Sequence, residues 1–210
     1  MPTIAKNNDV VTVVVIFSVE PERQQELADS IVEFVETAVK QQPGFVSASI
    51  HKSLDGIRVM NYAQWNQEDY KAFVQNSEVQ SLGAKLSEFP KPDSHLYEVV
   101  VSVPEDAKLK ISTGGLIHLA EFRVKPENQQ RLMELERENV VIALDHPDLI
   151  SANFHRSLDG TRTINYGQWR SLENFEVLLK EPKYTPLSEY WRGLAENEFH
   201  LYEVVFTLAC

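Results

Sequence analysis

The sequence predicts an α+β protein built from two copies of one βαββαβ unit. Residues 51–65 return, with conservative changes, as residues 155–169. Around each copy the patterns read strand, helix, strand, strand, helix, strand, which is the ferredoxin-like order. A unit of roughly 100 residues buries a modest share of its surface by itself. Duplication within one chain therefore indicates that the two units pack together as an internal pseudo-dimer.

The elements of the first unit follow from hydrophobic periodicity and from turn residues. β-branched and aromatic runs predict strands, and apolar residues spaced by threes and fours predict helices. An Asp-Gly pair between two strand-like runs favours a hairpin. The expected spans are strand 10–19, helix 21–41, hairpin strands 45–52 and 57–65, a helical region 66–89 with a break near Gly83, and strand 94–101.

The second unit repeats this order after a linker. Residues 104–115 are first charged and then rich in Ser and Gly, as linkers are. We place the boundary near Lys108, which gives one ferredoxin-like domain over 1–107 and another over 108–210. The expected spans of the second unit are strand 116–124, helix 126–144, hairpin strands 149–156 and 161–169, a helix over 172–194 interrupted by Pro182 and Pro186, and strand 199–208.

Composition excludes several classes of partner. A formal net charge of −11 argues against binding to nucleic acid or to an anionic membrane, since both depend on clustered Lys and Arg. No apolar run approaches the ~18 residues that span a bilayer, and the polar start predicts no signal peptide. The single cysteine, Cys210, forms no intrachain disulfide. These features together favour a cytoplasmic protein.

Metal and cofactor motifs are missing from the sequence. The six histidines are scattered and there is no cysteine pair, so we expect no metal site. No glycine-rich dinucleotide motif, Walker loop or nucleophile elbow occurs. Redox chemistry would have to proceed without a motif-bound cofactor.

The repeated hairpin carries the candidate site. Because side chains alternate along a strand, Asn61, Ala63 and Trp65 share one face. The second copy presents Asn165, Gly167 and Trp169 in the same way. A small residue between an amide and an indole leaves room for a ligand. The alternative is that each Asn bonds backbone at the start of the next helix and that each Trp is core.

Other polar residues of the repeats admit both functional and structural interpretations. His51 and His155, expected near the hairpin turn, would orient or deprotonate an acidic phenol, or would cap the turn through Asp55 or Asp159. The other polar repeat residues are expected to have structural roles: hairpin surface pairs for Arg58 and Arg162, a domain interface for His95 and His200, and packing for Tyr97 and Tyr202.

The hairpin also resembles a known family. Residues 45–48, His51, Ser53, Asp55-Gly56 and 61–65 are similar to the antibiotic biosynthesis monooxygenase family, specifically to its cofactor-independent, quinone-forming members. The resemblance covers both halves of the chain. It implies a dimeric α+β barrel, formed here within one chain.

The resemblance implies oxidation of an anthrone-like phenol to a quinone by molecular oxygen, without flavin or metal. It assigns catalytic roles to Asn61, Trp65, Asn165 and Trp169, and it places a substrate-binding tyrosine near Tyr70 or Lys71. Phe175 stands at that position in the second unit, so the phenol is missing there. The heme-degrading branch has an Asn where this chain has Phe17 and Phe122, which argues against that activity.

Two hypotheses follow. The first is a cofactor-free monooxygenase that acts on a small polycyclic phenol, and whether the pseudo-dimeric chain forms a further homodimer is left open. The second is a non-catalytic barrel that binds a small apolar ligand or serves in a stress response. The volume and polarity of the cavities beside Trp65 and Trp169 discriminate between them.

Overall fold

The computed structural model describes residues 1–6, 9–105, 109–178 and 180–210. Unit one contains β2 (Val10–Ser18), α1 (Gln24–Phe34), β3 (Phe45–Ser53), β4 (Arg58–Asn66), α2 (Gln67–Gln75), α3 (Ser77–Leu82) and β5 (Asp93–Val103). Unit two contains β7 (Leu116–Val124), α4 (Pro126–Ala143), β8 (Leu149–Ser157), β9 (Arg162–Trp169), α5 (Leu172–Leu178) and β10 (Ala195–Ala209).

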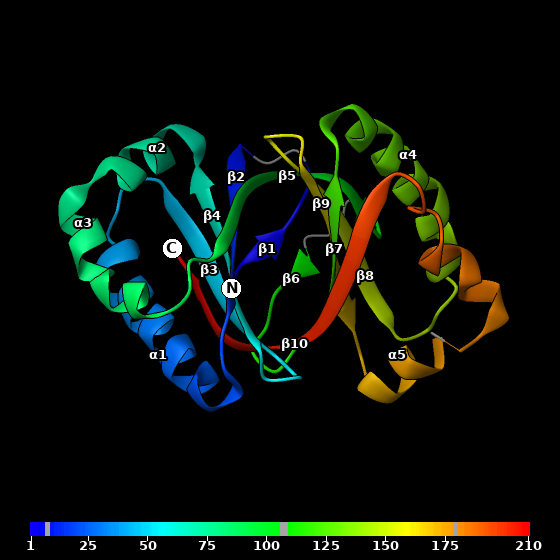
Figure 1. Cartoon of the computed structure of the whole chain (residues 1–210), viewed down its shortest axis with the longest axis horizontal. Helices are drawn as coiled ribbons and strands as arrows, with labels where there is room; N and C mark the ends of the chain where they lie inside the picture. The colour runs from blue at the N-terminus through cyan, green and yellow to red at the C-terminus, as the bar shows by residue number, and fades with distance from the viewer. Residues whose placement is uncertain (7–8, 106–108, 179) are drawn as a thin grey trace.

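These strands form one closed barrel in the order β10-β3-β4-β2-β5-β8-β9-β7. Helices of unit one cover one flank of the barrel and helices of unit two cover the other (Figure 1). This arrangement confirms the predicted fold class of two tandem ferredoxin-like repeats in an intrachain α+β barrel.

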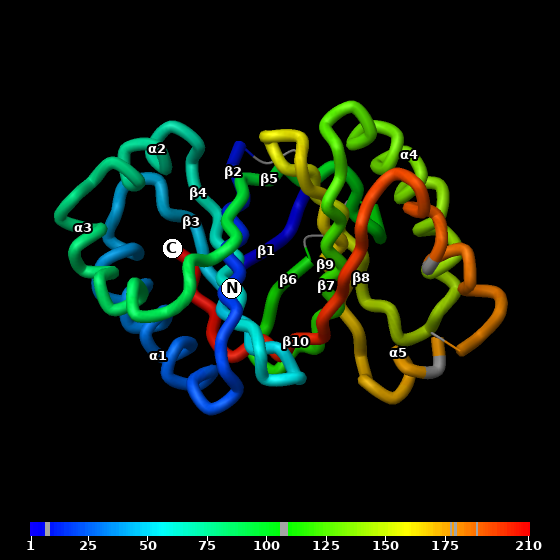
Figure 2. Tube along the Cα trace, in the orientation of Figure 1, coloured from blue at the N-terminus to red at the C-terminus, as the bar shows by residue number. Residues whose placement is uncertain are grey.

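The last strand of each unit joins the two halves. β5 pairs with β2 of its own unit and with β8 of unit two. β10 pairs with β7 and then continues along β3 of unit one. Figure 2 shows β10 crossing the molecule, so that the C-terminus lies on the side of unit one. The four barrel strands of each unit therefore have no unpaired outer edge along β5 or β10.

Both faces of the barrel strands are buried. One face points into the barrel, where Tyr62, Tyr166 and Tyr202 form part of an apolar cluster. The other face packs against the helices, as Ala48 and Trp65 do in unit one. Period-two alternation thus divides each strand into an interior set and a helix-facing set.

Two glutamines fix the correspondence between the units. The Gln24 amide donates to the backbone carbonyls of Ser53 and Arg58, each at 2.9 Å. Gln129 repeats this contact in unit two with the carbonyls of Ser157 and Arg162, at 3.0 and 2.9 Å. Each glutamine ties its helix to both ends of the hairpin turn. The two helices can therefore be compared residue by residue from this point.

The first helices of the two units nevertheless differ in length. In unit one, α1 is preceded by a 3₁₀ turn, Pro21–Arg23, and continues as a π-helical segment, Val35–Val39. In unit two, α4 is uninterrupted. Between matched prolines, 21–43 holds one residue more than 126–147. A π-turn accommodates a single inserted residue, which accounts for the difference.

The second helical regions are more broken than predicted. In unit one the region divides at Asn76, whose side chain accepts from the backbone N–H groups of Glu78 and Val79 at 3.1 and 3.3 Å. A 3₁₀ helix, Ala84–Glu88, follows. In unit two the described residues of this region form α5 and a 3₁₀ helix, Pro182–Ser188, and β10 begins at Ala195 instead of residue 199.

A small sheet was not predicted. β1 (Thr3–Ile4) pairs antiparallel with β6 (Leu109–Lys110), so the start of the chain contacts two residues within the predicted linker. The predicted boundary between residues 107 and 108 lies outside the described residues. Within the described ranges no helix is long and apolar enough to cross a membrane.

Candidate functional site

Each unit holds a cavity between its helices and the outer face of the barrel. The cavity of unit one, lined by β2, β4 and α1, has a volume of about 140 Å³. The cavity of unit two, lined by β7, β9, α4 and β10, has about 310 Å³. Neither cavity is filled by side chains. The larger volume is within the range of small-molecule sites, and the smaller one lies below it.

The predicted hairpin residues line these cavities. Asn61, Ala63 and Trp65 contribute to the wall in unit one. Asn165, Gly167 and Trp169 contribute to the wall in unit two. The three side chains share a face because they alternate along one strand, as the sequence pattern predicts.

The two asparagines keep an unpaired oxygen. Oδ1 of Asn61 and Oδ1 of Asn165 are buried and have no hydrogen-bond partner among the described residues. The expectation that each amide bonds backbone does not hold for these carbonyl oxygens. A buried polar atom without a partner costs about 1–3 kcal/mol, so a ligand that bonds it recovers that free energy.

The two tryptophans are not equivalent. Trp65 packs in an aromatic cluster with Phe45, Tyr70 and Phe73, at ring centroid distances of 5.3, 5.6 and 4.4 Å. The indole Nε1 of Trp169 is buried and has no hydrogen-bond partner within the part of the chain that the structure describes. A Cβ at Gly167 would lie 3.2 Å from that nitrogen. The glycine of unit two therefore leaves the space that this indole occupies, where unit one has Ala63.

A buried carboxyl group lies in the cavity of unit two. Glu136 on α4 is fully buried and lines the cavity. The Thr163 hydroxyl donates to its Oε1 at 2.8 Å, and Oε2 has no partner in the described chain. Burial raises the pKa of Glu136 well above its ordinary value, which favours the protonated, neutral acid. In that form the free Oε2 can donate a hydrogen bond.

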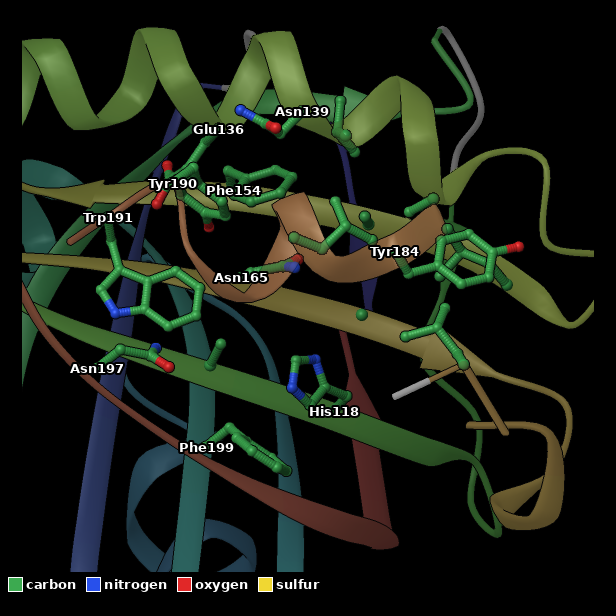
Figure 3. A pocket seen from close by; sticks show the side chains of 18 of the residues that line it. His118, Glu136, Asn139, Phe154, Asn165, Tyr184, Tyr190, Trp191, Asn197 and Phe199 are labelled. Atoms are coloured by element: carbon green, nitrogen blue, oxygen red, sulfur yellow. The ribbon is translucent and has the colours of Figure 1, made fainter. Parts of the chain in front are cut away.

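A histidine lines the same cavity from the barrel side. His118 on β7 packs against Phe175 and Phe199, at ring centroid distances of 4.8 and 5.2 Å. Burial lowers its pKa to about 4, so the imidazole is neutral near pH 7 and its ring nitrogens can hydrogen-bond a ligand. Figure 3 shows Glu136 reaching in from the helix layer and His118 from the opposite side, with Asn165 between them.

Aromatic residues enclose the cavity of unit two. Tyr190 and Trp191 pack on one another at 5.2 Å and on Phe122 at 5.9 and 5.6 Å. Phe175 packs edge-on to Trp169 at 5.2 Å. The predicted aromatic positions after each hairpin thus reach the cavities, with Tyr70 in unit one and Phe175 in unit two.

The polar groups of unit two have apolar counterparts in unit one. His118 pairs with Gly167 in the strand ladder, and Val13 pairs in the same way with Ala63.

Two turns beyond the matched glutamines, Glu136 in α4 corresponds to Ile31 in α1. Thr163, which holds Glu136, corresponds to Val59, and both Ile31 and Val59 belong to the apolar core of unit one. A comparison of the two repeats at positions between the helices and the barrel would have found these residues. The hairpin motif alone did not reveal them.

The two hairpin histidines occupy a different place from the one predicted. His51 and His155 lie within strands, with their side chains inside the barrel, and neither lines either of the two cavities described above. Their Nε2 atoms meet the hydroxyls of Tyr166 and Tyr62 at 2.8 and 2.9 Å. Their predicted position at the hairpin turn is therefore corrected, and their role in substrate binding stays a prediction. The physical reason is alternation, since each histidine faces away from the helix-facing residues beside it.

The hairpin turns are capped by other histidines. His200 bonds Asp55 at 2.6 Å and His95 bonds Asp159 at 2.7 Å, each between the two units. This confirms the interface position predicted for His95 and His200, and it corrects the alternative in which His51 and His155 cap the turns. Arg58 also reaches across, to Glu121 at 2.7 Å and to Glu198 at 2.9 Å, instead of forming a surface pair in its own hairpin.

The described residues contain no group of three or more His, Cys, Asp or Glu side chains arranged to hold a metal ion. The polar groups that line the cavity of unit two include the Asn165 amide, the Trp169 indole N–H, the neutral Glu136 carboxyl and the neutral His118 imidazole. Such a set suits hydrogen bonding to the oxygens of an uncharged or singly charged organic ligand.

A two-unit α+β barrel with a helix-covered cavity in each half defines a class of small-molecule-binding barrel proteins. Within that class, the model of the antibiotic biosynthesis monooxygenase family matches residues 10–84 and 115–186, one match in each unit. The chain belongs to the antibiotic biosynthesis monooxygenase family.

Similar proteins carry related names. A segment of 73 residues is 48% identical to tetracenomycin-F1 monooxygenase of Streptomyces glaucescens, and it covers 34% of this chain and 65% of that protein. The crystal structure of an anthrone oxidase-like protein matches with a TM-score of 0.88 at 21% identity, covering 99% of this chain and 96% of the other. A candidate monooxygenase from Fusobacterium nucleatum matches with a TM-score of 0.67 at 10% identity, covering 95% and 94%. The two structures show a shared fold.

Proposed function

We propose that this chain is a cofactor-independent monooxygenase that oxidises an anthrone-like polycyclic phenol to a quinone with molecular oxygen, and that unit two carries the activity. One observation carries the proposal: in unit two, the buried Asn165, Trp169 and Glu136 leave polar atoms unpaired around one aromatic cavity. The names of the similar proteins, a tetracenomycin-F1 monooxygenase and an anthrone oxidase-like protein, support the reaction class.

The reaction needs little from the protein beyond binding and proton transfer. An electron-rich phenolate carbon transfers an electron to oxygen, and the two radicals combine to a peroxide anion on that carbon. This anion takes back the proton that left the carbon and becomes a hydroperoxide. Loss of water then leaves a carbonyl, so that a CH₂ group and O₂ yield C=O and H₂O. The enzyme must favour the anionic tautomer and keep bulk water away.

The residues of unit two supply these functions. The unpaired Oδ1 of Asn165 accepts a hydrogen bond from a phenolic hydroxyl of the substrate, and the indole N–H of Trp169 donates to a substrate oxygen. His118 accepts the proton that leaves the substrate carbon, and the adjacent anion stabilises the resulting imidazolium. The aromatic wall formed by Phe175, Tyr190 and Trp191 excludes water. Asn61 and Trp65 are proposed to shape the smaller cavity of unit one without turnover.

The test uses 1,8-dihydroxyanthrone as the probe, with oxygen uptake and quinone absorbance as readouts. We expect one O₂ consumed per quinone formed and no quinone under nitrogen. Asn165→Ala should lower kcat/KM by about 100-fold, whereas the matched Asn61→Ala should leave it within about twofold. Quinone formation that ignores removal of oxygen, or equal effects of the two variants, would contradict the proposal. Probe binding without oxygen uptake would instead support a binding protein.

A further inference from the structure

The buried carboxyl group of Glu136 lacks the full set of hydrogen bonds that a stable core usually provides. It is fully buried, it has one hydrogen bond, from Thr163 at 2.8 Å, and its Oε2 is unpaired. No cation pairs with it among the described residues. Unit one fills the equivalent space with Ile31 and Val59, both fully or almost fully buried. The same fold thus exists with an apolar pair at this position, so packing does not require the acid.

We propose that Glu136, positioned by Thr163, is a specificity-determining residue that donates a hydrogen bond from Oε2 to a second oxygen of the substrate. The ligand class that fits is a planar polycyclic with two separate oxygen functions, one for Asn165 and Trp169 and another for Glu136. This inference rests on the proposed function for the identity of the site, and it adds a requirement on the substrate.

The contacts determine which atom of Glu136 faces the ligand. The Thr163 hydroxyl donates to Oε1, so that oxygen acts as an acceptor. The proton of the neutral acid is then on Oε2, the atom without a partner. Burial, which favours the protonated form, supports this assignment. A neutral acid can donate to a carbonyl or phenolate oxygen, whereas an ionised carboxylate would repel the phenolate.

The position of Glu136 separates it from the other polar groups. It extends from α4, in the helix layer, whereas Asn165 and Trp169 lie on β9 in the barrel wall (Figure 3). Tyr190 and Trp191 are on the cavity wall beside it. A flat ring system between the two layers would present one oxygen to β9 and another to α4. A planar hydrocarbon of the same size would leave the acid unpaired.

The experiment measures binding, which requires no oxygen chemistry. The probes are 1,8-dihydroxyanthraquinone, which carries several oxygen atoms, and anthracene, which has the same three fused rings but no oxygen atom. Affinities are measured by fluorescence for the full chain. Glu136→Ile with Thr163→Val reproduces the pair found in unit one, Glu136→Gln keeps a neutral donor and acceptor, and Ile31→Leu is the matched change in unit one.

We expect the Ile/Val pair to weaken binding of the quinone by about tenfold or more and to leave or improve binding of anthracene. Glu136→Gln should stay within about threefold of the wild type, and Ile31→Leu should have no effect. A loss in Glu136→Gln equal to that of the Ile/Val pair would show that charge is needed and would overturn the proposal. Unchanged quinone binding by the Ile/Val pair would also overturn it.

These outcomes are separable from failure of the proposed function. A wild-type protein that binds the quinone through Glu136 but consumes no oxygen with the anthrone would refute the oxygenase and leave the recognition role standing. A protein that oxidises the anthrone equally well with and without Glu136, and binds both probes alike, would refute the recognition role alone. Glu136→Leu without the change at Thr163 serves as a second variant should the pair fail to fold.

Discussion

The imidazole Nε2 of His51 in unit one lies 2.8 Å from the hydroxyl of Tyr166 in unit two. The contact is repeated in reverse by Tyr62 and His155 at 2.9 Å. Nδ1 of His155 faces the backbone carbonyl of Asn153 at 3.0 Å and therefore carries the proton. Each tyrosine then donates to a neutral histidine, and burial lowers the pKa of both histidines to about 4. Two reciprocal hydrogen bonds thus join the units inside the barrel.

Tyr166→Phe should destabilise the barrel without affecting the cavities. The change leaves His51 Nε2 buried without a donor, which we expect to lower the free energy of unfolding by about 1–3 kcal/mol. Tyr62→Phe should have a similar effect because it removes the symmetric contact. Urea denaturation measures both variants, and binding of 1,8-dihydroxyanthraquinone to each should match the wild type. A variant that loses binding but keeps stability would contradict the structural role.

Replacing Glu136 and Thr163 by the Ile and Val of unit one should stabilise the protein. The double change removes a buried, half-paired carboxyl and fills the space with apolar atoms, which removes a cost of about 1–3 kcal/mol for the unpaired polar atom. Thermal melting should therefore show a higher Tm, while binding of the quinone weakens. The reverse graft, Ile31→Glu with Val59→Thr, should lower Tm. A lower Tm for the first variant would mean that the acid contributes to stability after all.

Gly167→Ala tests the space beside Trp169. The added methyl group would lie 3.2 Å from the indole Nε1, closer than an ordinary contact, so the ring must shift. A shift of this kind should lower kcat/KM for the anthrone by about tenfold. Ala63→Gly in unit one is the matched control and should leave activity unchanged. Equal activity of Gly167→Ala and the wild type would remove Trp169 from the proposed site.

Glu121 should make stability depend on pH. Burial raises its pKa to about 7 from an ordinary 4.5, although Arg58 lies 2.7 Å away and opposes the shift. At a pH between these two pKa values, the folded protein keeps a proton that the unfolded chain has released. The contribution of Glu121 to the free energy of unfolding therefore falls as pH rises. Glu121→Gln, which stays neutral, should gain stability relative to the wild type across that window, by at most about 3 kcal/mol.

Denaturation of both proteins at several pH values measures this difference. Buried His51, His118 and His155 act in the opposite sense, because their pKa values are lowered to about 4 and their contribution is lost as pH falls. They are common to both proteins and cancel in the comparison. Glu127→Gln changes an exposed residue in the first turn of α4, and its stability relative to the wild type should not follow the pH dependence expected for Glu121→Gln. A difference that does not change with pH would contradict the role of Glu121.

Local patterns were sufficient to predict the order of elements, the two hairpins and the shared face of Asn165 and Trp169. These features depend on periodicity and turn chemistry, which are properties of short segments. The position of His51 inside the barrel was not predicted, because both faces of these strands are buried. Alternation separates the residues into two sets, but it does not say which set faces the helices.

Glu136 was missed because its neighbours in the sequence are charged. It lies between exposed Glu134 and Glu138. Its spacing of four from both Leu132 and Val140 nevertheless places it on the buried face of α4, and a comparison with Ile31 in the other repeat gives the same result. The break at Asn76 was missed for a related reason, because capping by an asparagine side chain does not interrupt the apolar pattern.

Strands β5 and β10 each pair with strands of both units, so the two units form one barrel within one polypeptide. This arrangement has a consequence for evolution. In a barrel made from two identical chains, any substitution appears on both sides of the two-fold axis, so a costly acid in one cavity is imposed on the other. Fusion into one polypeptide removes that symmetry. One half can then keep Ile31 and Val59 as an apolar scaffold, while the other holds Glu136, His118 and a larger cavity. The covalent link allows stability and recognition to be selected separately within one barrel.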